Sequence, residues 1–102
     1  MRTFYFVGIS AILAVIANAQ IPGDSPPISI QSGRALFLKN CAHCHGADAH
    51  GDEGPDLHGL DWTDRQIAIR IRNGKKGEMT AFDGKLQTNE IKSLIAYLRS
   101  LK

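Results

Sequence analysis

The chain has 102 residues, 43% of them apolar and 22% charged, with 12 Lys and Arg against 10 Asp and Glu. This length allows a single domain, and the composition is ordinary for a globular protein. The small excess of positive charge is far from the basic balance of nucleic-acid-binding domains, so we expect no nucleic-acid partner.

The first 19 residues have the pattern of a secretory signal peptide. Arg2 precedes an apolar run from Phe4 to Ala17, and Ala17-Asn18-Ala19 has the small-residue spacing that a signal peptidase accepts. We therefore expect cleavage before Gln20. An uncleaved membrane anchor is the alternative, but a spanning helix needs about 20 apolar residues and this run is shorter. The sequence predicts export with no stable membrane insertion.

Removal of 19 residues would leave 83, in which residues 20–29 form a Pro- and Ser-rich leader and residues 30–102 form the domain. A domain of this size buries little surface and usually needs disulfides, a metal or a cofactor for stability. Cys41 and Cys44 are the only cysteines. A disulfide between them would close too small a loop to contribute much. We therefore expect a larger group to fill the core.

The domain contains three helical patterns and no alternating strand pattern, which predicts an all-α fold. Each predicted helix begins near a hydroxyl side chain that can cap its first turn. The capping candidates are Ser29 or Ser32, Thr63, and Thr88. Gln66 completes a capping box with Thr63. The first helix should end near Asn40, and the second at Asn73-Gly74. The third carries an apolar stripe at helical spacing, formed by Ile91, Leu94, Ile95 and Leu98.

The motif Cys41-Ala42-His43-Cys44-His45 is compatible with three kinds of site. A zinc site could combine the cysteines with two of His43, His45, His50 and His58, but these imidazoles lack the usual paired-ligand spacing. A thioredoxin-like redox disulfide needs a preceding strand, and the motif lies among helices. The pattern C-x-x-C-H is also the attachment signal for c-type haem, in which both thiols bond to the ring and the histidine ligates iron. Behind an export signal in a short helical chain, we favour haem.

The haem interpretation is tested by whether the sequence offers a second iron ligand on the face of the ring opposite His45. Iron with His on one face takes Met, another His or no protein ligand on the other. Met79 lies 34 residues after His45, between the second and third predicted helices, and that length of chain can pass round the ring edge. His50 is five residues from His45, at most roughly 18 Å even when extended. We favour Met79, with His58, a lysine or an open position as alternatives, and we interpret the other histidines as loop or surface residues.

From Ser29 to Leu101 the sequence resembles a class I monohaem cytochrome c domain of the small bacterial type, with His and Met as iron ligands. The family arrangement G-x-x-x-[FY]-x-x-x-C-x-x-C-H matches Gly33, Phe37 and the cysteine motif. Three further segments are similar to family segments: GPDLHGL (54–60), IRNGKKGEMTAF (71–82) and EIKSLIAYLRSL (90–101).

The resemblance implies a cytochrome c fold, with three main helices around one covalently attached haem c and the N- and C-terminal helices packed together. It implies that Cys41 and Cys44 form the haem thioethers, that His45 is the proximal iron ligand and that Met79 is the distal one. The carbonyl of Pro55 would accept a hydrogen bond from His45 and so fix the orientation of the ring.

Other family features concern the packing and the rim of the site. Gly33 and Phe37 would pack against the C-terminal helix near Leu94 and Tyr97. The indole N–H of Trp62 would contact a haem propionate, unless this side chain is an ordinary core or rim tryptophan. One residue departs from the family: Thr80 stands where proline usually follows the ligand methionine. Proline would stiffen this loop, so the departure affects loop rigidity.

The resemblance and the predicted ligands together imply electron transfer and not catalysis. Iron with two protein ligands has no open position for a substrate. We expect a soluble, monomeric one-electron carrier of the bacterial periplasm whose partners are redox proteins: a dehydrogenase or membrane complex as donor, and an oxidase or reductase as acceptor. The alternatives are a haem protein with an open sixth position, acting as a gas sensor or weak peroxidase, and a haem-free disulfide oxidoreductase or zinc module.

Overall fold

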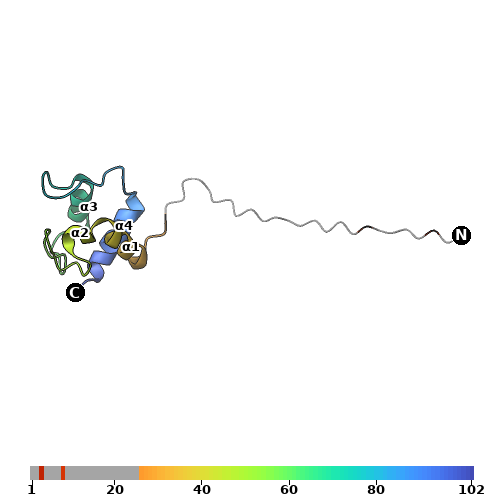
Figure 1. The fold of residues 1–102 in the computed structure, drawn as a ribbon, viewed down its shortest axis with the longest axis horizontal. Coiled ribbons are helices and arrows are strands. Elements are labelled where there is room, and N and C mark those ends of the chain that lie inside the picture. Colours follow the sequence, from red (N-terminus) through yellow and green to blue (C-terminus); the bar gives the residue numbers. More distant parts are fainter. Residues whose placement is uncertain (1–2, 4–7, 9–25) are drawn as a thin grey trace.

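The computed structural model describes residues 3, 8 and 26–102. Four helices follow one another in this part of the chain: α1 (Ile30–Asn40), α2 (Ala42–His45), α3 (Asp64–Asn73) and α4 (Thr88–Ser100). These residues contain no strand, only an isolated antiparallel bridge between Lys75 and Met79. The all-α prediction is confirmed (Figure 1). Most of the predicted signal peptide and most of the predicted leader lie outside the described residues.

The contact between α1 and α4 is the centre of the fold (Figure 1). Gly33 of α1 lies directly against the backbone of α4, because a β-carbon at this position would be 1.9 Å from the Ser93 carbonyl oxygen. The Phe37 and Tyr97 rings pack with their centroids 5.3 Å apart. The Ser29 N–H donates to Ser93 Oγ over 3.1 Å. The predicted packing of these two helices is therefore confirmed, with Gly33 as the residue that permits it.

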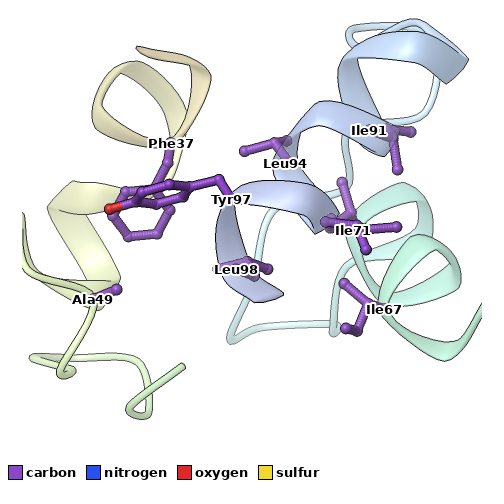
Figure 2. Packing of buried hydrophobic residues seen from close by; sticks show 9 residues of the cluster. Phe37, Ala49, Ile67, Ile71, Ile91, Leu94, Tyr97 and Leu98 are labelled. Atoms are coloured by element: carbon purple, nitrogen blue, oxygen red, sulfur yellow. The ribbon is translucent and has the colours of Figure 1, made fainter. Parts of the chain in front are cut away.

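The apolar face of α4 supplies most of the core. Its predicted stripe is buried along its whole length, at Ile91, Leu94, Ile95 and Leu98. Ile67 and Ile71, one helical turn apart on α3, are buried as well. Figure 2 shows both of these side chains directed toward α4, with the Phe37 and Tyr97 rings in contact on the other side of that helix. The core thus lies between α4 and the two helices that flank it.

Two of the three predicted caps are observed. Ser29, rather than Ser32, caps α1, because the Ser32 N–H donates to Ser29 Oγ over 3.0 Å. Thr63 and Gln66 form the predicted capping box, in which the Thr63 N–H donates to Gln66 Oε1 over 2.8 Å and the Gln66 N–H donates to Thr63 Oγ1 over 3.1 Å. α3 ends at Gly74, as predicted, with a φ of +62° that favours glycine.

The predicted cap of α4 is wrong by one residue. Thr88 is the first helical residue, and Gln87 is the N-cap, with extended backbone angles of φ −75° and ψ 162°. The Gln87 N–H donates to Glu90 Oε1 over 2.9 Å. The acidic side chain three residues after the cap therefore determines where the helix begins, and the hydroxyl of Thr88 does not.

The short helix α2 was not predicted. Cys41 departs from helical geometry with φ −121°, and a single turn then resumes, in which the His45 N–H donates to the Cys41 carbonyl over 3.0 Å. Four residues are too few to show an apolar period. This turn places the whole C-x-x-C-H motif between the end of α1 and the loop that follows.

Candidate functional site

A cavity of about 700 Å³ opens between the helices and the two long loops. This volume is within the range of roughly 300–1,000 Å³ that is usual for ligand pockets. All six predicted site residues line it: Cys41, Cys44, His45, Pro55, Trp62 and Met79. The rest of its wall is largely apolar, with Phe37, Leu57, Leu60, Ile67, Ile71, Phe82, Leu94 and Leu98. An apolar wall that also presents two thiols, an imidazole and a thioether fits an iron porphyrin attached through cysteine.

His45, the predicted proximal ligand, is the last residue of α2 and has only 8% of its surface exposed. Its Nδ1 atom lies 2.9 Å from the carbonyl oxygen of Pro55. A proton on Nδ1 leaves the lone pair of Nε2 available for a metal, which is how a hydrogen-bonded imidazole is usually prepared for ligation.

The loop after α2 wraps closely around this imidazole. The Gly54 N–H donates to the Cys44 carbonyl over 2.7 Å, and the Gly51 N–H donates to the His45 carbonyl over 2.8 Å. A β-carbon on Gly54 would lie 2.8 Å from His45 Cε1 and 2.9 Å from Nδ1. Gly54 is therefore the residue whose lack of a side chain lets the loop close on the ring. The GPDLHGL segment contained this glycine, but its spacing alone did not show that role.

Replacing Gly54 with alanine is expected to shift the imidazole of His45, because a methyl group at 2.8 Å overlaps the ring. The shift should lengthen the contact with Pro55 and change the optical spectrum and reduction potential of the haem protein. Asp52→Ala, at an exposed position of the same loop, is the control. Equal spectra and potentials for the wild-type protein and Gly54→Ala would show that the loop and ring are not tightly packed.

Met79, the predicted distal ligand, lies in the loop between α3 and α4 and is half-buried. The Lys75 N–H donates to the Met79 carbonyl over 2.9 Å, and the Met79 N–H donates to the Lys75 carbonyl over 2.7 Å. A β-carbon on Gly74 would lie 2.4 Å from the Met79 carbonyl oxygen. The Phe82 N–H donates to the Ile71 carbonyl over 3.0 Å. These backbone contacts position the loop although proline does not follow the methionine.

Trp62 lies at the rim of the cavity with 41% of its surface exposed. The Arg70 guanidinium lies over its ring, 5.3 Å from the centroid. The Trp62 carbonyl accepts a hydrogen bond from Arg99, which also bonds to Asp64. This position suits either predicted role of the residue, a contact with a propionate or an ordinary rim side chain.

The surroundings of Cys41 differ from those of a redox-active thiol. Burial, and in second place the neighbouring Cys44, raises the pKa of the Cys41 thiol from 9.0 to about 11. Thiols that exchange disulfides have a lowered pKa instead. No strand precedes the motif in residues 26–102 either. The site therefore does not resemble that of a thioredoxin-like oxidoreductase.

The histidines do not assemble around the cysteines as a zinc module would require. His43 and His45 line the cavity, whereas His50 and His58 stack on one another elsewhere in the loop, with ring centroids 3.7 Å apart. No sequence pattern signals the pairing of these last two histidines, which are eight residues apart in a loop. Within the described residues, no helix is long and apolar enough to cross a membrane.

Comparison with known proteins identifies the family. The model described as cytochrome c oxidase, cbb3-type, subunit III matches residues 29–98. The chain is 32% identical over 94 residues to the cbb3-type cytochrome c oxidase subunit FixP of Rhizobium meliloti, covering 85% of this chain and 32% of FixP. It is 38% identical over 71 residues to a cytochrome c-553-like protein of Synechocystis, covering 68% and 66%. The chain thus spans about a third of the length of the FixP relative.

The fold agrees with these similarities. The crystal structure of cytochrome c6 from the diatom Phaeodactylum tricornutum superposes with a TM-score of 0.60 and 31% identity, covering 69% of this chain and 90% of that one. Together with the matched family model and the composition of the cavity wall, this places a covalently bound haem c in the domain. The chain belongs to the cytochrome c family whose model is described as cbb3-type cytochrome c oxidase subunit III.

Proposed function

We propose that this haem-based electron carrier is a soluble one-electron shuttle of the bacterial periplasm. In this proposal Cys41 and Cys44 hold haem c through thioethers, and His45 and Met79 are its axial ligands. The observation that carries the proposal is that Cys41, Cys44, His45 and Met79 line one largely apolar cavity, although the first three lie at helix α2 and Met79 lies in the loop between α3 and α4. When bound, the haem supplies an Fe(II)/Fe(III) couple.

The protein's contribution is to hold the ligands and exclude water. The Pro55 carbonyl keeps the His45 ring in one orientation, and the backbone bonds between Lys75 and Met79 keep the loop of the thioether in place. Ligands that are held in this way need little rearrangement between the two redox states. Methionine ligation and an apolar wall both favour the reduced state, so the potential should be high for a haem.

The proposed location and partners have separate support. The pattern of residues 1–19 favours export. Relatives whose names identify them as subunits of cbb3-type oxidases suggest a terminal oxidase as an electron acceptor. The rim residue Trp62 is exposed beside the cavity and offers a contact surface for such a partner. We propose that the carrier is monomeric and that its contacts with partners are transient.

The optical spectrum of the purified protein tests the proposed ligands. We expect sharp α and β bands in the reduced form and a weak red sulfur-to-iron band in the ferric form, because Met79 occupies the sixth position. Binding of carbon monoxide to the native reduced protein would instead favour the open-position alternative. A protein without a Soret band, after expression with a haem-attachment system, would contradict both.

A further inference from the structure

The loop between α2 and α3 brings a second set of metal-binding side chains together, away from the cavity. His50, Asp56 and His58 each offer one ligand atom, and these three atoms lie within 4.8 Å of one another. The His58 Nδ1 is 2.7 Å from Asp56 Oδ1, and the His50 Nδ1 is 3.3 Å from Asp56 Oδ2. The two imidazole rings are stacked, with an angle of 6° between their planes.

A backbone hydrogen bond brings two of these residues together. The Leu57 N–H donates to the Ala49 carbonyl over 2.8 Å, which places the next residues, His58 and His50, side by side. Ala49 is fully buried and has a φ of +63°, a conformation that is uncommon for a residue other than glycine. Such a conformation persists where the surrounding structure holds it, so the loop segments around Ala49 and Leu57 have a fixed relative position.

A close approach between Gly51 and the backbone of Asp56 also fixes the position of the Asp56 carboxylate. A β-carbon on Gly51 would lie 2.9 Å from the backbone nitrogen of Asp56, so the two chain segments touch. The His58 N–H also donates to Asp56 Oδ1 over 2.8 Å. The hydrogen bonds to His58, with a smaller contribution from His50, lower the pKa of Asp56 from 3.8 to about 2, so this side chain is an anion at neutral pH. The Asp56 carboxylate thus lies as an anion beside the His50 and His58 imidazoles, and the backbone of the loop places all three residues together.

Two imidazoles and one carboxylate are ligands that suit borderline divalent ions such as Zn²⁺ and Cu²⁺. Zinc–ligand bonds of about 2.0–2.2 Å in a tetrahedral site place neighbouring ligand atoms roughly 3.3 Å apart. The two imidazole nitrogens lie 2.7 and 3.3 Å from different oxygens of the Asp56 carboxylate, and all three ligand atoms lie within 4.8 Å of one another, so side-chain rotation could bring them to one ion. His50 and Asp56 remain exposed, with 59% and 51% of their side-chain surface accessible, so an ion can enter from solvent and keep water as a further ligand.

We propose that His50, Asp56 and His58 form a binding site for a divalent transition-metal ion of the zinc and copper class, separate from the haem. It differs from a zinc module built on the cysteines, because neither thiol takes part. The proposal requires that His58 is not an iron ligand, and His58 lies outside the lining of the cavity.

Calorimetric titration of Zn²⁺ into the ferric holoprotein tests this site. We expect one bound ion per chain in the wild-type protein. His50→Ala and His58→Ala should each weaken binding by about tenfold or more, which corresponds to about 1.4 kcal/mol or more. Asp56→Asn should weaken binding in the same way while keeping an acceptor for the His58 N–H. Asp61→Asn is the matched control for Asp56→Asn, because it neutralises an exposed carboxylate that lies outside both the cluster and the cavity lining. It should leave the affinity unchanged.

A second measurement separates loss of ligands from loss of fold. The Soret spectrum and far-ultraviolet circular dichroism of each variant should match those of the wild-type protein. Electron paramagnetic resonance of added Cu²⁺ should show coupling to two nitrogen atoms, reduced to one in His50→Ala and in His58→Ala. No Zn²⁺ binding to the wild-type protein, or undiminished binding to the folded double variant His50→Ala/His58→Ala, would overturn the proposal.

Discussion

Gly33→Ala is expected to destabilise the holoprotein by about 2 kcal/mol or more, although alanine is the better helix former. Intrinsic propensity favours alanine over glycine by about 1 kcal/mol in a helix. The new methyl group, however, would lie 1.9 Å from the carbonyl oxygen of Ser93 and 2.8 Å from Tyr97 Cβ. Backbone atoms cannot escape by changing rotamer, so α1 and α4 must separate. Overpacking of this kind typically costs about 1–3 kcal/mol and sometimes more.

Guanidinium unfolding of the holoprotein, followed by circular dichroism, measures this effect. Arg34→Ala, at an exposed position of the same helix, is the control and should change the unfolding free energy by no more than about 0.5 kcal/mol. Helix propensity predicts that Gly33→Ala increases the free energy of unfolding, whereas overpacking predicts that it decreases this free energy. An increase in its stability would mean that propensity outweighs packing and that the two helices are not in close contact at this point.

Met79→His is expected to retain a low-spin spectrum and to lower the reduction potential by on the order of 100 mV or more, within the roughly 0.8 V range that axial ligands span. The physical reason is that the thioether favours the ferrous state, whereas imidazole is a stronger donor to the ferric ion. For a one-electron couple, each 59 mV is a factor of ten in the redox equilibrium, so the expected change is easily resolved by potentiometric titration.

Thr80→Ala is the matched control, because Thr80 is exposed next to Met79. Its potential should stay close to that of the wild-type protein. Met79→Ala adds a second readout: removing the thioether should let the reduced protein bind carbon monoxide. If the potential of Met79→His equalled that of the wild-type protein, Met79 would not be an iron ligand.

The helices could be predicted from the sequence because their signals are local. The Thr63 and Gln66 capping box and the glycine after Asn73 determine both ends of α3 within a few residues of chain. The start of α4 was misplaced because two neighbouring residues, Gln87 and Thr88, could both precede the helix. The Glu90 side chain accepts a hydrogen bond from the Gln87 N–H, and this bond makes Gln87 the N-cap.

The site was predictable only in part, for a different reason. The cysteine motif has two thiols and an imidazole in five consecutive residues, so it could be recognised as a candidate site from the sequence, and the resemblance to the family then implied its ligands. The close approaches of Gly54 to the His45 ring and of Gly74 to the Met79 backbone depend on how distant segments meet. The stacking of His50 on His58 likewise depends on the bond between Leu57 and Ala49, which no local pattern signals.

The contact between α1 and α4 also has a consequence for the order of events during biosynthesis. Ser29 and Ser93 are hydrogen-bonded although 64 residues separate them, and the C-x-x-C-H motif lies inside that span. Closing so long a loop carries an entropic cost, so this contact forms late compared with local turns. Until α4 has been synthesised and docked, Leu94 and Leu98 cannot cover the cavity. We therefore expect haem attachment to precede the docking of α4, which would then enclose the haem.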